Sequence, residues 1–390
     1  MSTGPLRVGI DVRLAHWPGI GRYIDEIVSR MVADFPATEW VLFANAAGPA
    51  TLRAYSDPGL PERLRSGNVR FVACAAAPFS PAEPLLLGRL VRNERLQVMH
   101  SPYINIPWLP RQAPPLVVTL HDFRHPDLAL QAGAPRTWAK RGYYELLTRL
   151  ALARAARLVC VSHFLARQFL DFRPSLAPRL SVIHHAAGDA FRPLASGAAA
   201  AEVGARFGIQ GRYLLFVGTL KPHKNLLAVV QALARPEVPA DLQLVVAAAP
   251  DLRYPAVGAE LARLGLTSRV RMLGHVDKDR LPALYGAALA TLLPSAYESF
   301  GLPLVESMAC GTPVIAAPRA ALPEVGADAA WYAEPEAEPL AQAICKALSD
   351  GPAQRQRRAA SLAQAGRFSW RRAAAALHAE YLRAAAGAAP

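Results

Sequence analysis

Short apolar runs rich in β-branched residues alternate along the whole chain with longer stretches in which apolar residues recur three and four positions apart. The first pattern predicts buried strands and the second predicts helices that cover them. The predicted strands are residues 6–10, 40–44, 69–74, 97–100, 116–120, 157–161, 180–183, 213–217, 242–247, 270–273, 290–293 and 313–316. Residues 21–34 predict the first helix. Strands and helices in this alternating order indicate an α/β protein with doubly wound parallel sheets.

The alternation breaks once, over residues 186–211, where Ala and Gly dominate and apolar periodicity is weak. We interpret residues 191–211 as a linker between an N-terminal domain, 1–190, and a C-terminal domain, 212–368, followed by a last helix in 369–390. A length of 390 residues agrees with two domains. Ligands of such sheets bind beyond the carboxyl ends of the strands, so functional residues are expected there.

Composition excludes several classes of protein. Hydrophobic residues make up 52% of the chain and charged residues 19%, which is too apolar for a disordered protein. No run approaches the length of a membrane-spanning helix, and we expect a cytoplasmic protein. The cysteines are widely spaced, which indicates reduced core residues rather than disulfides or a zinc site. They are Cys74, Cys160, Cys310 and Cys345.

A net charge of +13 calls for an anionic partner. Arginines recur three apart at Arg89, Arg92 and Arg95, and a second basic group, 136–141, precedes the apolar residues 146–152. Such helix faces either are solvated edges or lie on an anionic membrane, which predicts peripheral contact with the inner face of the plasma membrane. Aromatic residues do not alternate with these cations, so no nucleic-acid partner is expected.

The most informative segment, residues 294–313, reads PSAYESFGLPLVESMACGTP. Glu298 precedes a glycine-containing turn that opens a helix, and Glu306 is placed about two turns into that helix. Backbone N–H groups of residues 299–301 would face phosphate or sugar oxygens, and the carboxylates could accept hydrogen bonds from the diols of a sugar and a ribose. The alternative is two ordinary surface glutamates.

A second segment, residues 216–225, reads FVGTLKPHKN and leads from a strand into a basic loop. Gly218 would let the backbone approach a diphosphate, and Lys224 could neutralise its charge. A solvated loop lysine is the alternative.

Near the N-terminus, Gly19, Gly21 and Arg22 follow the first strand. Dinucleotide binding is disfavoured because the third glycine of that motif and the acidic residue after the second strand are both missing. The glycines then form either a cleft loop or a simple tight turn. His121 directly follows the strand 116–120, where a cleft residue is expected; a structural histidine or a metal ligand within residues 121–127 are the alternatives.

Three further patterns are given no chemistry. Asp277 and Asp279 are read as an N-cap before a helix at Arg280, and His184 with His185 as packing at a strand end. Glu324 is assigned no role.

On these segments the chain resembles the retaining GT-B glycosyltransferases of family 4, in particular their mannosyltransferase-like branch. The resemblance covers nearly the whole chain and implies two Rossmann-like domains facing across a cleft, with the last helix crossing back to the first domain. It also implies a nucleotide-diphosphate sugar as donor and no metal ion or other cofactor.

The resemblance assigns roles residue by residue. Catalytic positions are His121, near the donor sugar, and Glu298, which contacts it. Glu306 would contact the ribose, and Lys224 the diphosphate. Other donor-binding positions are Gly218, Thr219, His223, Ser299, Phe300, Gly301 and Leu302, and the cleft loop of the N-terminal domain is Gly19, Gly21 and Arg22. Thr219 and His223 depart from the family, in which one of these positions often carries an arginine.

The expected function is retaining transfer of a hexose, with mannose from GDP-mannose as the favoured donor. The expected acceptor is a lipid-linked oligosaccharide of a bacterial surface polysaccharide such as O-antigen, capsule or exopolysaccharide. Three alternatives stay open: transfer from a UDP-sugar or to another acceptor, a non-catalytic protein that binds nucleotide sugars or nucleic acid, and an epimerase acting on UDP-GlcNAc.

Overall fold

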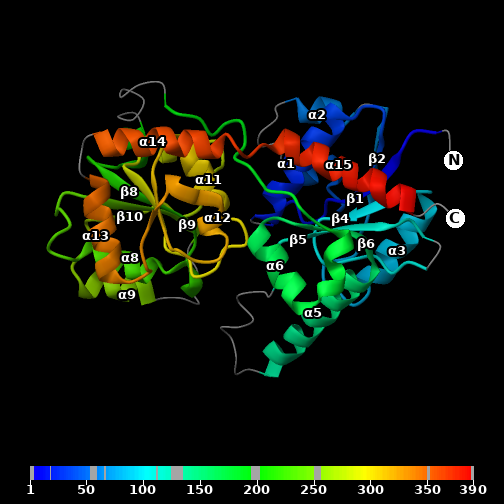
Figure 1. Cartoon of the computed structure of the whole chain (residues 1–390), viewed down its shortest axis with the longest axis horizontal. Helices are drawn as coiled ribbons and strands as arrows, with labels where there is room; N and C mark the ends of the chain where they lie inside the picture. The colour runs from blue at the N-terminus through cyan, green and yellow to red at the C-terminus, as the bar shows by residue number, and fades with distance from the viewer. Residues whose placement is uncertain are drawn as a thin grey trace. The chain divides into compact units, whose positions relative to one another are not determined.

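The computed structural model describes residues 4–17, 19–52, 59–65, 67–110, 113–123, 135–194, 203–249, 256–348 and 352–387. Figure 1 shows the chain coloured from its N-terminus to its C-terminus. It divides into two compact units, and each has its own parallel sheet. The first unit is Met1–His185 together with Trp370–Pro390, and the second is Ala186–Ser369.

The first unit is built on a seven-stranded sheet in the order β3-β2-β1-β4-β5-β6-β7, with every neighbouring pair parallel. Its strands are β1 (Arg7–Asp11), β2 (Glu39–Ala44), β3 (Val69–Ala73), β4 (Val98–Ser101), β5 (Leu116–Leu120), β6 (Ala155–Cys160) and β7 (Leu180–Val182). All residues of β4 and β5 are buried, as expected of central strands that helices cover on both faces.

Helices cover both faces of this sheet, with α1 and α15 on one side and α5 and α6 on the other (Figure 1). The helical elements are α1 (Ile20–Asp34), η1 (Gly48–Thr51), α2 (Leu60–Arg63), α3 (Glu83–Asn93), α5 (Pro135–Arg154), α6 (His163–Phe172), η2 (Pro174–Arg179) and α15 (Trp370–Gly387). Helix α15 packs against α1 and against β4, β5 and β6, so the end of the chain is part of the first unit.

The second unit has a six-stranded parallel sheet in the order β10-β9-β8-β11-β12-β13. Its strands are β8 (Tyr213–Thr219), β9 (Gln243–Ala249), β10 (Val270–Met272), β11 (Ala290–Leu293), β12 (Val314–Ala316) and β13 (Trp331–Tyr332). Its helical elements are η3 (Pro222–Lys224), α8 (Leu226–Leu233), α9 (Ala256–Arg263), α10 (Leu281–Ala287), α11 (Leu302–Ala309), α12 (Leu322–Gly326), η4 (Ala327–Ala329), α13 (Ala337–Leu348) and α14 (Pro352–Ala365). Helices α8 and α9 cover one face, and α11 and α14 the other (Figure 1).

Every strand predicted from the sequence is present, with small shifts at its ends. Strand β13 was not predicted, because two residues are too short to produce an alternating pattern. The segment interpreted as a linker contributes Phe191, Val203 and Ile209 to the core of the second unit, which begins at Ala186. These apolar residues are spaced too widely to give a periodic signal.

The predicted N-cap at Asp277–Asp279 is wrong. Helix α10 has Arg280 at its N-cap, in a helical conformation, with no side-chain capping hydrogen bond. The chain enters the helix through a turn in which the Arg280 N–H donates to the Asp277 carbonyl at 3.0 Å, so backbone bonding takes the place of a cap.

The cysteines are free, as expected; Cys74, Cys160 and Cys310 are buried, and Cys345 is half-buried. Among the helices that the structure describes, none combines the length and the apolar character needed to cross a membrane.

Candidate functional site

Strands β8 and β11 lie side by side in the second sheet, although they are far apart in the sequence. The chain continues from β8 to β9 on one side of β8, and β11 pairs with β8 on the other side. The winding therefore reverses between β8 and β11, and the loops after both strands lie at the edge where α/β sheets bind ligands. One loop carries Lys224 and the other carries Glu298.

Lys224 and Glu298 form an ion pair at this edge. The Lys224 Nζ lies 2.7 Å from Oε1 of Glu298, and the Ser295 hydroxyl donates to the same oxygen at 2.8 Å. The two charged side chains are only 17% and 12% exposed. Removal of either charge would leave its partner partly desolvated without a counterion. A bound anion would compete with Glu298 for the Lys224 ammonium group.

Two further hydrogen bonds hold the loops together. The Asn225 side-chain amide donates to the Pro294 carbonyl at 2.8 Å, and the Ala296 N–H donates to the His223 carbonyl at 2.8 Å. Asn225 has a left-handed backbone, φ +54°, which short polar residues tolerate better than most. Neither Asn225 nor Ser295 was predicted from the sequence, where their only signal is their position, Asn225 directly after Lys224 and Ser295 three residues before Glu298.

Helix α11 begins at Leu302 with Gly301 as N-cap, so Glu306 lies just over one turn into the helix rather than two. The Glu306 side chain is buried, and the Tyr285 hydroxyl donates to its Oε2 at 3.3 Å. Phe300 is also buried, with its ring edge-on to Phe368 at 5.6 Å. Ser299 and Leu302 are half-buried on either side of this turn.

Gly218 and Thr219 are the last residues of β8, paired with Ala248 and Ala249 of β9. The Thr219 hydroxyl is buried and makes no hydrogen bond to any part of the chain that the structure describes. His223 lies in η3, one residue before Lys224. The second unit thus places Gly218 and Thr219 at the end of β8 and His223 and Lys224 in the segment that follows. Glu298 lies before the start of α11, in the segment after β11.

In the first unit, His121 directly follows β5 and is buried. Burial lowers its pKa from 6.5 to about 3, against the opposing effect of a hydrogen bond to the Pro102 carbonyl, so the imidazole is neutral. Its Nε2 is buried and has no hydrogen-bond partner among the described residues. The proton therefore sits on Nδ1, facing Pro102, and Nε2 is left as a hydrogen-bond acceptor. Of the other candidate ligands in this segment, His125 and Asp127 lie outside the described residues.

The Tyr23 ring supports His121 from helix α1. It packs edge-on against His121 at 4.9 Å between ring centroids, and it lies tilted against His185 at 5.2 Å. The Tyr23 hydroxyl is hydrogen-bonded to Thr119 at 2.8 Å. His185 also packs against Trp370 at 5.2 Å, which confirms the packing role expected for it.

A buried chain of hydrogen bonds continues behind Tyr23. Thr119 is bonded to Nε2 of His100 at 3.0 Å, and the Tyr381 hydroxyl is bonded to Nδ1 of the same imidazole at 2.7 Å. It ties α1, β5, β4 and α15 together beneath His121. Sequence reasoning missed it, because two residues that are bonded directly, His100 and Tyr381, are 281 positions apart.

The predicted glycine loop is a tight entry into α1. Gly19 is the N-cap with φ +77°, and a Cβ on Gly21 would lie 2.1 Å from the Ala15 carbonyl oxygen, so only glycine fits there. Arg22 is buried and lies along its own helix, with its Nε 3.2 Å from Glu26. The packing of this turn accounts for the glycine at position 21 without a ligand.

A buried charge network lies after β1. The Arg13 guanidinium donates to Asp11 at 2.8 and 2.7 Å and to Glu83 at 2.5 Å, and Asn105 donates to both carboxylates. Burial raises the pKa of Glu83, against the opposing effects of Asn105 and Arg13. The network fixes the loop after β1 to the start of α3.

The sequence matches two family profiles, one in each unit. "Glycosyl transferases group 1" matches residues 206–365, and "Glycosyl transferase 4-like domain" matches residues 18–186. A D-inositol 3-phosphate glycosyltransferase from Mycolicibacterium smegmatis is 32% identical over 301 residues, which are 74% of this chain and 67% of that protein. The chain belongs to the group 1 glycosyl transferases.

Two further likenesses cover almost the whole glycosyltransferase. An O-antigen chain mannosyltransferase B from Escherichia coli is 28% identical over 381 residues, 90% of this chain and 92% of that protein. The solved structure of sucrose-phosphate synthase from Thermosynechococcus elongatus superposes with a TM-score of 0.76 at 20% identity, covering 97% of this chain and 98% of that one. The fold expected from the sequence, GT-B with two parallel α/β domains, is thereby confirmed.

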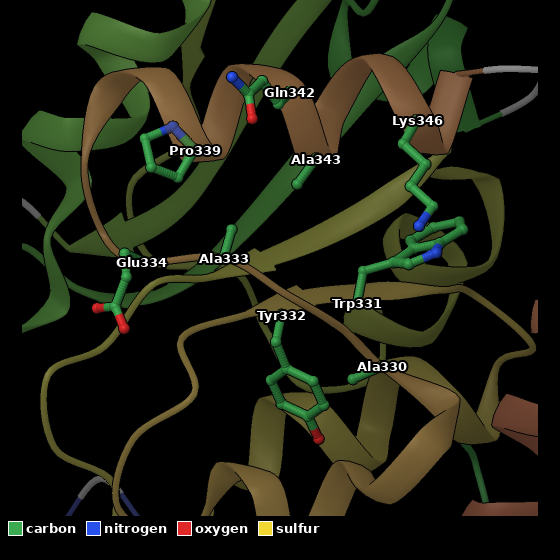
Figure 2. A pocket seen from close by; sticks show the side chains of 9 residues that line it. All are labelled: Ala330, Trp331, Tyr332, Ala333, Glu334, Pro339, Gln342, Ala343 and Lys346. Atoms are coloured by element: carbon green, nitrogen blue, oxygen red, sulfur yellow. The ribbon is translucent and has the colours of Figure 1, made fainter.

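A separate hollow of about 440 Å³ lies in the second unit of this glycosyltransferase, between β13 and α13 (Figure 2). Figure 2 labels Lys346 and Trp331 among the lining residues and shows that the Tyr332 side chain points away from the helix. The hollow is lined by residues 330–334 and by one face of α13, and none of the residues predicted to bind the donor lines it.

Proposed function

We propose that this glycosyltransferase transfers mannose from GDP-mannose to a lipid-linked oligosaccharide with retention of the anomeric configuration. The likeness to an O-antigen mannosyltransferase over nine-tenths of the chain supports the sugar and the place in bacterial surface polysaccharide synthesis. The Lys224–Glu298 pair at the switch point between β8 and β11 is the observation that carries the proposal.

The donor is bound by the second unit in this proposal. Lys224 faces the diphosphate and the backbone at the start of α11 adds N–H dipoles. Glu306 accepts hydrogen bonds from the ribose diol. Both described side-chain hydrogen bonds of Glu298 use Oε1. In this proposal its Oε2 accepts a hydrogen bond from a sugar hydroxyl.

In the proposed step, the acceptor oxygen forms a bond to the anomeric carbon on the face from which the diphosphate leaves. The bond between that carbon and the phosphate oxygen breaks, the hydroxyl proton passes to the departing phosphate, and GDP is released. Lys224 stabilises the charge that develops on the leaving group, so no protein nucleophile and no metal ion are needed. His121 acts as a neutral acceptor for a substrate hydroxyl through Nε2.

The test is thermal unfolding of the full chain with GDP, GDP-mannose, UDP, UDP-glucose and UDP-GlcNAc, each with EDTA present. At one hundred times the dissociation constant, a ligand adds about 2.7 kcal/mol, which corresponds to about 5 to 10 °C for a unit of this size. We expect shifts with the GDP ligands. Shifts with the UDP ligands alone would show that the donor is a UDP-sugar. No shift with any of the five ligands would overturn the proposed donor site.

A transfer assay completes the test. Release of GDP that requires both GDP-mannose and a lipid-linked acceptor is expected, and loss of that release with EDTA would refute the metal-free step. Turnover of UDP-GlcNAc without any acceptor would indicate an epimerase instead.

A further inference from the structure

Helix α3 has apolar residues on its outer side as well as on its inner side. Leu87 and Val91 are fully buried against the first unit, whereas Leu85 and Leu86 are 57% and 42% exposed. A surface helix normally turns polar residues outward, so exposed leucines at the start of α3 leave apolar area uncovered.

The exposed Trp108 adds to this area from a neighbouring loop. The backbone N–H of Trp108 donates to the Pro84 carbonyl at 2.7 Å. The Trp108 carbonyl oxygen would lie 2.2 Å from a Cβ on Gly88, so the loop packs directly against α3. Trp108 is 51% exposed, and the Arg154 guanidinium of α5 lies over its indole ring at 5.3 Å. We call this area the α3–Trp108 surface; it comprises Leu85, Leu86, Arg89, Arg92, Trp108 and Arg154.

The charge of this surface is of one sign. Arg89 and Arg92 are exposed on α3, while the acidic residues at the two ends of the helix, Glu83 and Glu94, are buried. Glu83 is bonded to Arg13, and Glu94 is paired with Arg7. Both carboxylates are thus paired with cations inside the unit and do not offset the exposed arginines of α3. The positive charge of this surface has the same sign as the net charge of the chain, +13.

We propose that the α3–Trp108 surface docks this protein on an anionic lipid bilayer. Leucine and tryptophan side chains insert at the boundary between head groups and acyl chains, and the arginines bind lipid phosphates. A purely polyanionic partner would use the arginines but not the exposed leucines. The inference does not depend on the donor or on sugar transfer.

The structure also changes the membrane contact that the sequence suggested. Arg95 follows the end of α3 with a left-handed backbone, φ +49°, and is not part of the helix face. The side chains of Arg136 and Lys140 lie outside the described ones. Trp108 had no signal in the sequence, because it joins α3 only through the folded loop.

The experiment is cosedimentation of the full chain with vesicles of phosphatidylcholine alone or with about one-third phosphatidylglycerol. We expect binding to the anionic vesicles that weakens as salt is raised. Arg89→Gln/Arg92→Gln should weaken it about 25-fold, because each arginine near an anionic surface contributes about a fivefold factor. Leu85→Ser/Trp108→Ser should weaken it about tenfold.

Leu382→Ser is the matched control, since Leu382 is 51% exposed on α15, and it should bind as the unchanged protein does. Brominated lipids should quench tryptophan emission in the unchanged protein and much less in Trp108→Phe, which keeps the aromatic ring. Circular dichroism and thermal unfolding confirm that each variant is folded.

Three results would overturn the proposal: no binding to anionic vesicles, equal binding to neutral ones, or full binding by the Leu85→Ser/Trp108→Ser variant. Binding of a single-stranded oligonucleotide without binding of vesicles would assign the surface to nucleic acid, and this too would overturn it. The thermal shift that GDP produces is measured separately on the unchanged protein and on the surface variants. A normal shift together with absent vesicle binding would overturn the membrane proposal and leave the proposed donor site standing.

Discussion

The ion pair between Lys224 and Glu298 leads to a prediction in which stability and ligand binding move in opposite directions. At 2.7 Å and an effective dielectric constant of about 20, the attraction between the charges is about 6 kcal/mol. Most of it is offset by the cost of desolvating two side chains that are 17% and 12% exposed. A net coupling of about 1 to 2 kcal/mol is expected, between that of an exposed pair and that of a buried one.

Glu298→Gln should therefore lower the free energy of unfolding by about 2 kcal/mol, because Lys224 is left partly buried without its counterion. The same change should tighten GDP binding about 5- to 30-fold, since the diphosphate no longer competes with a carboxylate for the ammonium group. Transfer of mannose should still fall about 10- to 100-fold, because a charged hydrogen bond to the sugar is lost.

Lys224→Gln should reduce stability by a similar amount but weaken GDP binding. The double variant should be only slightly less stable than either single variant. After the first substitution the ion pair is already broken, so the second one leaves no further charge without a counterion. Urea unfolding measures the stabilities, and titration calorimetry with GDP measures the affinities.

The matched control is Glu334→Gln, which breaks the Arg319–Glu334 pair in the same unit. Its atoms are 2.6 Å apart, but its side chains are 47% and 48% exposed, so a change of less than about 0.5 kcal/mol is expected. Additive losses in the Lys224 and Glu298 variants, or weaker GDP binding by Glu298→Gln, would refute the reasoning.

Other predictions concern the first unit. Gly21→Ala should destabilise it by about 3 kcal/mol, because the new Cβ would lie 2.1 Å from a carbonyl oxygen, whereas Gly67→Ala, with open space around it, should be nearly neutral in thermal unfolding. Arg13→Met should cost about 3 to 5 kcal/mol in urea unfolding, because two buried carboxylates lose their shared cation; a loss below about 1 kcal/mol would contradict this. Burial lowers the pKa of His100 and His121 to about 3, so protons bind the unfolded chain more strongly. The contribution of the two neutral histidines to the free energy of unfolding should be fully present above about pH 6.5. On acidification below that pH it should fall by about 1.4 kcal/mol per pH unit for each histidine. The fall in melting temperature between pH 7 and 5 should be shallower in His121→Gln, and an equal slope would count against the buried neutral state.

Local patterns were enough to predict the strands and most positions of the candidate residues. His121 follows β5, and Glu298 precedes α11, as the strand ends and the glycine turn indicated. Such signals succeed because they depend on neighbours in the chain. Glu306 was placed more than half a turn too far along its helix, because helix boundaries depend on capping and packing that the pattern does not show.

By itself, the sequence determined a two-domain α/β protein with its candidate residues at strand ends and in the loops and helices that follow them. Its resemblance to known glycosyltransferases supplied the expected activity. Apolar periodicity and loop composition are local properties, and each can be read within a few residues.

Only the tertiary structure decided which of those loops meet. Lys224 and Glu298 are 74 positions apart, and they pair because β8 and β11 are neighbours in the sheet. His100 and Tyr381 meet over 281 positions because α15 packs on the first unit. Strand order and helix docking result from burial of whole surfaces, which no single segment of sequence encodes.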